Sequence, residues 1–178
     1  MARGGVTGVL LVGGASRRFG SPKALARIGD ETLAERAWRI LGETFKARIA
    51  VGKAADGLDL PFPVLDDGTD ARAALAGIVA GARAAATDVL VVVPVDVPLV
   101  TGDSLRALAE ACADAAVTQT GPLPAALRRS ALPELERRLA AGDYELRRAF
   151  AHIDTVTVRV DASQLVNVNT PDDLRSVG

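Results

Sequence analysis

The sequence predicts an α/β fold in three layers: a mostly parallel sheet with an antiparallel strand, covered by helices on both faces. Two observations indicate this fold. Short apolar runs alternate with segments of helical periodicity through the first two thirds of the 178 residues. The run from Val89 to Val93 is apolar at every position, which is typical of a strand buried on both faces at the centre of a parallel sheet. Ligands of such sheets bind outside the carboxyl ends of the strands.

The strands are predicted from short runs of aliphatic residues that end at turn signals. Prolines beside the third run make that strand short or close to an edge. In the run from Thr155 to Val160, valines alternate with polar residues, so we expect a half-exposed strand. The predicted strands are residues 9–12, 48–51, 62–65, 89–93, 115–118, 155–160 and 165–168, and residues 121–124 are interpreted as a loop.

The helices are predicted from apolar residues at helical spacing and from capping residues. Thr32 can cap the first helix, and Pro133 suits the first turn of a later one. Gly77 and Gly81 share one face of a helix, which indicates the close approach of a neighbouring element. The predicted helices are residues 33–41, 72–86, 104–113, one from Pro133 to Gly142, one that Asp143 caps and that runs to Phe150, and one from Thr170.

The composition excludes several classes of function. The formal net charge is −1 and aromatic residues make up 3%, so we expect no nucleic-acid partner. No apolar run is long enough to span a bilayer, and residues 1–5 do not resemble a signal peptide. Cys112 and His152 are the only residues of their kinds, which argues against an internal disulfide, a cysteine-based zinc site and a catalytic triad. We therefore expect one cytoplasmic domain over residues 1–178, without membrane contact.

Residues 8–23 have the pattern of a cradle for polyphosphate. A buried strand ends at Gly13-Gly14, where backbone N–H groups can approach a ligand closely. Arg18 and Lys23 add cationic donors in the same loop. The segment is neither a P-loop, since Ala24 rather than a hydroxyl residue follows Lys23, nor a Gly-x-Gly-x-x-Gly turn.

Polar residues that suit a metal or a second substrate follow other predicted strands. Asp96 comes directly after the central strand and lies between prolines, and a rigid carboxylate there suits Mg²⁺ bound together with substrate phosphates. Asp67 and Gly52 follow two neighbouring strands. Asn167 and Asn169 fall on one face of the last predicted strand, where their amides can bind sugar hydroxyls, phosphates or a metal.

Together these residues resemble a known family. The segment Leu11-Val12-Gly13-Gly14-Ala15-Ser16-Arg17-Arg18-Phe19-Gly20-Ser21-Pro22-Lys23 is similar to the nucleotidyltransferase signature Leu-Ala-Gly-Gly-x-Ser-x-Arg-Met-Gly-x-Asp-Lys. Residues 93–98 resemble its metal-binding segment. Residues 121–130 and 167–174 look like the MobA-like molybdenum cofactor guanylyltransferases. The resemblance implies a Rossmann-like nucleotidyltransferase fold and Mg²⁺-dependent transfer of GMP from GTP to the phosphate of molybdopterin, with release of pyrophosphate.

The resemblance also implies a role for individual residues. Lys23, Arg18 and Asp96 would be the catalytic residues, with Asp96 as the Mg²⁺ ligand. The residues implied to contact nucleotide, pterin or metal are Leu11, Val12, Gly13, Gly14, Lys23, Asp67, Asp96, Asn167 and Asn169. Transient contacts with proteins that mature molybdoenzymes are implied as well.

The chain departs from the family pattern around the expected base and ribose. Pro22 replaces an aspartate, Val12 replaces an alanine, and Gly52 stands where an asparagine is common. The family turn Gly-Pro-Leu-Ala-Gly reads Ala73-Ala74-Leu75-Ala76-Gly77. Two alternatives therefore stay open: a relative that uses CTP or acts on a small phosphorylated substrate, and a non-catalytic nucleotide-binding relative.

Overall fold

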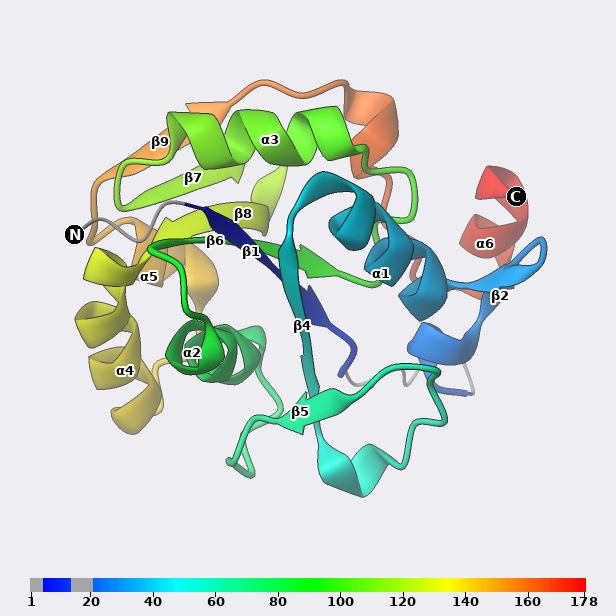
Figure 1. Cartoon of the computed structure of the whole chain (residues 1–178), viewed down its shortest axis with the longest axis horizontal. Coiled ribbons are helices and arrows are strands. Elements are labelled where there is room, and N and C mark those ends of the chain that lie inside the picture. Colours follow the sequence, from blue (N-terminus) through cyan, green and yellow to red (C-terminus); the bar gives the residue numbers. More distant parts are fainter. Residues whose placement is uncertain (1–4, 14–20) are drawn as a thin grey trace.

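The protein is built around one seven-stranded sheet with the strand order β5-β4-β1-β6-β8-β7-β9 (Figure 1). The computed structural model describes residues 5–13 and 21–178. The strands of this sheet are β1 (Val6–Leu11), β4 (Ala47–Gly52), β5 (Val64–Asp66), β6 (Val89–Pro94), β7 (Ala115–Thr118), β8 (Gly121–Arg128) and β9 (Thr155–Val158). A small antiparallel pair, β2 (Arg27–Ile28) and β3 (Glu31–Thr32), lies outside it.

The sheet is mostly parallel, as predicted. Strand β1 pairs in parallel with β4 and β6, and β4 pairs in parallel with β5. Among the described strands of this sheet, only β8 runs against its neighbours, because it is antiparallel to both β6 and β7. The apolar strand β6 lies fourth of seven in the strand order, which confirms its predicted central place. The amino-terminal end of β8 therefore lies at the same sheet edge as the carboxyl ends of β1, β4 and β6.

Helices cover both faces of the sheet, which gives the three predicted layers. Alternate residues of β1 divide between two cores, so that Leu10 packs on one face and Val9 and Leu11 on the other. Helices α1 and α3 cover the first face, and α2, α4 and α5 cover the second (Figure 1). The helices are α1 (Leu33–Thr44), α2 (Ala74–Ala84), α3 (Gly102–Ala111), α4 (Leu132–Ala140), α5 (Leu146–Phe150) and α6 (Pro171–Val177).

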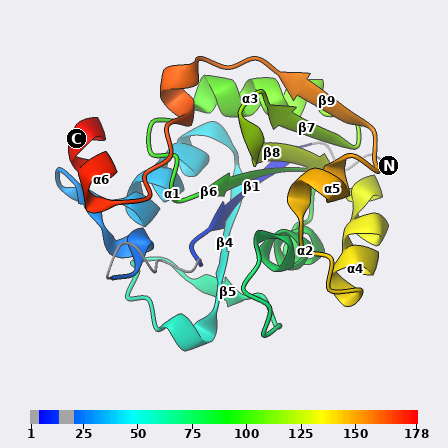
Figure 2. The ribbon, with the colours of Figure 1, turned by 180° about the vertical axis from the view of Figure 1, so that it is seen from behind.

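The helix starts follow from capping residues in the sequence. Thr32 and Glu35 form a capping box before α1, in which Thr32 Oγ1 accepts from the Glu35 N–H at 3.1 Å and the Thr32 N–H donates to Glu35 Oε2 at 2.8 Å. Thr170 and Asp173 form the same arrangement before α6. Helix α6 lies beside the β2–β3 pair in both views (Figure 2). The carboxyl-terminal segment thus returns to the part of the molecule that holds β2.

The glycine face predicted in α2 is a packing contact. A Cβ on Gly77 would lie 2.8 Å from Leu11 Cδ2, and a Cβ on Gly81 would lie 2.7 Å from Val9 Cγ1. Both distances are too short for real carbon atoms, so the two glycines allow α2 to approach β1 closely.

Residues 121–124, predicted to be a loop, begin strand β8. The two prolines led to that prediction, since proline donates no ladder hydrogen bond. In the structure, Pro122 and Pro124 lie in the irregular stretch between the pairs Val117–Ala125 and Thr118–Gly121. Proline is tolerated there because the regular ladder with β6 begins only at Ala125.

Two further predictions near the carboxyl terminus are wrong. The predicted strand 165–168 is instead the end of a 3-10 helix (Ala162–Leu165) followed by an irregular segment. Its apolar residues are explained by burial rather than by strand pairing, because Val168 is fully buried. Asp143 does not cap α5, whose N-cap is Glu145. The Asp143 carboxylate instead accepts from Arg138 Nη1 at 2.5 Å.

Candidate active site

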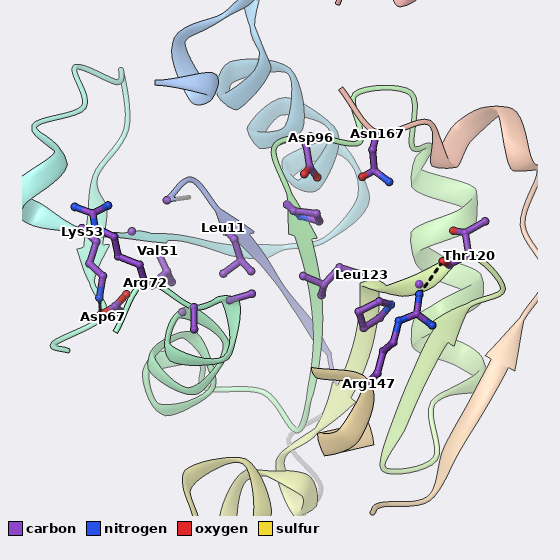
Figure 3. Close-up of a pocket in the computed structure, with 18 residues that line it drawn as sticks. Leu11, Val51, Lys53, Asp67, Arg72, Asp96, Thr120, Leu123, Arg147 and Asn167 are labelled. Carbon is purple, nitrogen blue, oxygen red and sulfur yellow. Dashed lines mark hydrogen bonds and ion pairs between the residues drawn. The ribbon is translucent and has the colours of Figure 1, made fainter. Parts of the chain in front are cut away.

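A cavity of about 440 Å³ lies at the sheet edge formed by the carboxyl ends of β1, β4 and β6 (Figure 3). This position agrees with the expectation for an open α/β sheet. Five of the residues predicted for the site line the cavity: Leu11, Gly13, Asp67, Asp96 and Asn167. The fold thus brings residues from both ends of the chain to one place.

Asp96 is one of the charged residues that line this cavity. It follows β6 between Pro94 and Pro98, and the Val95 N–H bonds the Leu11 carbonyl at 3.3 Å, which ties the segment to β1. Lys23 Nζ lies 3.6 Å from Asp96 Oδ2. Burial raises the pKa of Asp96, and the charge of Lys23 opposes this shift.

The carboxyl-terminal asparagines lie on either side of a residue that is bonded to Asp96. The Val168 N–H donates to the Asp96 carbonyl at 2.8 Å. Asn167 lines the cavity, while Asn169 Oδ1 accepts a hydrogen bond from Lys23 Nζ at 3.0 Å. The two asparagines therefore lie close to Asp96 in the folded chain, but the segment that holds them is not the predicted strand.

The side chain of Val12 does not line the cavity. Its side chain is buried, and a Cβ on Gly52 would lie 2.8 Å from Val12 Cγ2. The Val12 N–H bonds the Val51 carbonyl at 3.0 Å, which continues the β1–β4 ladder toward Gly13. Gly52 and Gly77 both line the cavity, so parts of its wall are bare backbone. Gly14 and Arg18, also predicted for the site, lie outside the described residues.

One end of the cavity holds cations that the sequence analysis did not assign. Lys53 directly follows β4, and its Nζ lies 2.7 Å from Asp67 Oδ1. Arg72 Nη2 lies 2.8 Å from Asp56 Oδ1. Both cations line the cavity, together with Ala73 and Ala74 of the altered family turn. A lysine immediately after a strand at the ligand-binding edge is the sequence signal that could have revealed Lys53.

The opposite end is formed by β8, the turn before it and α5. Thr120, Leu123 and Arg147 line this end, and Arg147 Nη2 donates to the Thr120 carbonyl at 3.4 Å. Figure 3 places Arg147 and Thr120 across the cavity from Lys53, Asp67 and Arg72, with Leu11 and Leu123 between them. The sequence analysis assigned none of these three residues to the site, because it did not place β8 beside β6.

The donor set around Asp96 suits a metal that takes most of its ligands from substrate and water. Among residues 5–13 and 21–178, no cluster of three histidine, cysteine or acidic side chains could hold a metal ion. One carboxylate with a neighbouring amide fits Mg²⁺, which is usually bound by one or two carboxylates together with substrate phosphates. It does not fit a structural zinc site.

A family model described as the MobA-like NTP transferase domain matches residues 8–158. The chain belongs to the MobA-like NTP transferase family. Among curated relatives of this MobA-like chain, a probable molybdenum cofactor guanylyltransferase of Chloroflexus aggregans is 33% identical, covering 97% of this chain and 93% of the relative. A molybdenum cofactor guanylyltransferase of Burkholderia vietnamiensis is 33% identical, covering 97% and 95%.

Solved structures share the MobA-like fold. The molybdopterin-guanine dinucleotide biosynthesis protein A of Archaeoglobus fulgidus superposes with a TM-score of 0.82 at 26% identity, covering 96% of this chain and 95% of that one. A 2-C-methyl-D-erythritol 4-phosphate cytidylyltransferase of Thermus thermophilus gives a TM-score of 0.69 at 19% identity, covering 94% and 95%, which shows the fold alone. No helix within the described ranges is long and apolar enough to cross a membrane.

Proposed function

We propose that this protein is a molybdenum cofactor guanylyltransferase. It would transfer GMP from GTP to the phosphate of molybdopterin. The observation that carries the proposal is the position of Asp96, which lies in the cavity beside Lys23 and between two chemically different ends. The names of the curated relatives, which match this chain over nearly its whole length, support the choice of substrates.

In the proposed reaction, an oxygen of the acceptor phosphate attacks the α-phosphorus of GTP. A new P–O–P linkage forms, the bond from the α-phosphorus to the bridging oxygen breaks, and pyrophosphate leaves with its electron pair. The chain needs no acid or base for this step, since the nucleophile is already an anion. Its task is to hold two anionic substrates in line and to stabilise the charge that moves to the leaving group.

Individual residues fit these tasks. The backbone at Leu11, Val12 and Gly13 would lie against the nucleotide, and Asp67 would contact its nucleoside. Lys23 would neutralise the triphosphate, together with Arg18. Asn167 and Asn169 would face the pterin. Mg²⁺ at Asp96 would supply a positive charge that screens the phosphates from one another.

The turn that departs from the family pattern is the reason to test the nucleotide directly. Ala73, Ala74 and Gly52 all line the cavity, so the changed positions fall within reach of a nucleotide. The assay measures pyrophosphate release with molybdopterin, Mg²⁺ and either GTP or CTP. We expect at least tenfold preference for GTP, about 1.4 kcal/mol in transition-state binding. A preference for CTP would overturn the guanylyl assignment.

The first prediction concerns Asp96. Changing Asp96→Ala should lower pyrophosphate release at least a hundredfold, because the proposed metal ligand is lost. Circular dichroism and thermal unfolding should match the wild type, since the Asp96 side chain is 29% exposed and lines the cavity. Asp103→Ala is a matched control, as that carboxylate pairs with Arg106 on the exposed surface of α3. Activity that survives Asp96→Ala would contradict the metal assignment.

A further inference from the structure

Lys53 and Asp67 form an ion pair that is almost completely enclosed. Their side chains are 11% and 6% exposed, and Lys53 Nζ lies 2.7 Å from Asp67 Oδ1. Lys53 follows β4, whereas Asp67 follows β5, so the pair joins the carboxyl ends of two neighbouring strands. The Asp67 N–H also bonds the Gly52 carbonyl at 3.0 Å, which keeps the two segments in register.

The hydrogen bonds described for the Asp67 carboxylate all go to one of its two oxygen atoms, Oδ1. Asp67 Oδ1 accepts from Lys53 Nζ, from the Thr69 N–H at 3.0 Å and from Thr69 Oγ1 at 3.2 Å. Lys53 Nζ also donates to the Thr69 carbonyl and lies 3.3 Å from Thr69 Oγ1. Within the described part of the chain, Asp67 Oδ2 accepts no hydrogen bond, while Asp67 lines the cavity.

We propose that Lys53 is a positioning residue, which holds the Asp67 carboxylate so that Oδ2 accepts a hydrogen bond from the nucleoside of the substrate. This inference rests on the proposed function. Lys53 fixes the orientation of the carboxylate by engaging Oδ1 in a charge-assisted hydrogen bond. The ammonium group itself is turned toward Asp67 and Thr69, so it acts through Asp67.

A carboxylate oxygen accepts hydrogen bonds, so it favours a substrate group that donates one. The base of GTP offers a ring N–H and an amino group on the same edge, and ribose offers hydroxyl groups. Adenine and cytosine instead place an acceptor nitrogen at the corresponding ring position, which a carboxylate would repel. The base and the ribose can therefore both donate an N–H or O–H hydrogen bond to Asp67 Oδ2, and the experiment distinguishes the two.

The test measures nucleotide binding by calorimetry with Mg²⁺ and without acceptor, so that it does not depend on turnover. The nucleotides are GTP, ITP (which lacks the 2-amino group) and 2′-deoxy-GTP. The variants are Lys53→Met, Asp67→Asn, the double variant, and Lys53→Arg as a substitution that keeps the charge. Arg83→Met is the matched control, because Arg83 and Glu136 form an exposed pair at the same 2.7 Å distance.

We expect Lys53→Met and Asp67→Asn each to weaken GTP binding about tenfold or more, the effect of losing one charge-assisted hydrogen bond. The double variant should bind no worse than Asp67→Asn, because Lys53 acts through Asp67. Lys53→Arg should keep most of the wild-type affinity for GTP, and Arg83→Met should bind GTP as the wild type does. If the 2-amino group of the base is the donor, the GTP-to-ITP affinity ratio falls in Lys53→Met; if the 2′-hydroxyl of ribose is the donor, the GTP-to-2′-deoxy-GTP ratio falls. A donor that all three nucleotides share, such as the ring N–H, lowers all three affinities equally.

A purely structural role for Lys53 predicts a different result. The melting temperature would fall in Lys53→Met while the affinity for GTP and both affinity ratios stayed those of the wild type, and this outcome would overturn the inference. Additive losses in the double variant would overturn it as well. The double variant has no uncompensated buried charge, so it keeps the test valid if Lys53→Met alone does not fold. A wild-type protein that does not bind GTP would instead refute the proposed function.

Discussion

At the scale of single residues, Asp96 combines two features that the sequence contains and one that it does not. The prolines on either side and the preceding apolar strand indicate a rigid carboxylate at the ligand-binding edge. The neighbours of Asp96 come from distant parts of the chain, since Lys23 lies 3.6 Å away and Val168 bonds its carbonyl. Burial raises the pKa of Asp96, so the proposed binding of a metal to its carboxylate should strengthen as the pH rises through that pKa.

A residue-scale prediction concerns Cys112, the only cysteine of the chain. Burial raises the pKa of its thiol to about 11, from an ordinary value of 9.0. About a hundredfold less thiolate is therefore present near pH 8 than for an ordinary cysteine, and the thiolate is the reactive form. We expect the native protein to react with a chromogenic disulfide reagent at least a hundredfold more slowly than protein unfolded in urea. Rapid reaction of the native protein would show that Cys112 is accessible.

At the scale of elements, the sequence predicts regular strands and helix starts well. It fails for segments that are buried without pairing in a sheet, and for a strand whose first residues include prolines. The capping residues Thr32 and Thr170 act locally, so their helices begin where predicted. The segment 165–168 is apolar because Val168 enters the core, but no strand of the described chain pairs with it. Residues 121–124 show the reverse case, in which prolines occupy an irregular part of a real strand. Short apolar runs cannot distinguish these cases without knowledge of the neighbouring strand.

The close contact between α2 and β1 gives an element-scale prediction. Gly81→Ala would place a Cβ 2.7 Å from Val9 Cγ1 in a fully buried position. We expect a loss of about 1–2 kcal/mol in the free energy of unfolding, since overpacking outweighs the better helix propensity of alanine. Urea unfolding measures the change.

Val9→Ala provides the control for this contact. The double variant Gly81→Ala/Val9→Ala should be destabilised by less than the sum of the two single variants, because the smaller side chain makes room for the new Cβ. A Gly81→Ala protein that is more stable than the wild type would show that the helix does not need this glycine to approach the strand.

At the scale of the whole molecule, the sheet order decides how the cavity is divided. Strand β8 runs antiparallel beside β6, which brings the turn before β8 to the edge where β1, β4 and β6 end. Arg147 of α5 therefore faces the same cavity as Lys53, from the opposite end (Figure 3). Under the proposed function, the nucleoside lies at the Lys53 end and the anionic acceptor at the Arg147 end.

This division predicts separate effects on the two substrates. Arg147→Met should raise the KM for molybdopterin about tenfold, the effect of losing one contact to an anion, and should change the KM for GTP less than twofold. Steady-state kinetics with each substrate varied in turn provides the measurement. Arg148→Met is the control, because the adjacent arginine pairs with Asp143 and Glu145 on the surface. An increase in the KM for GTP alone would reverse the assignment of the two ends.

The sequence by itself determined the α/β class, the central place of the apolar strand and the glycine contact of α2, because each depends on a local pattern. It also determined the position of Asp96, because ligands of parallel sheets bind where the strands end. That residues 1–178 form one domain stays a prediction. Only the tertiary structure decided that Lys53 engages Asp67 and that Arg147 closes the far end of the cavity. Such pairings depend on strand order and on side-chain direction between segments far apart in the chain, which no local pattern encodes.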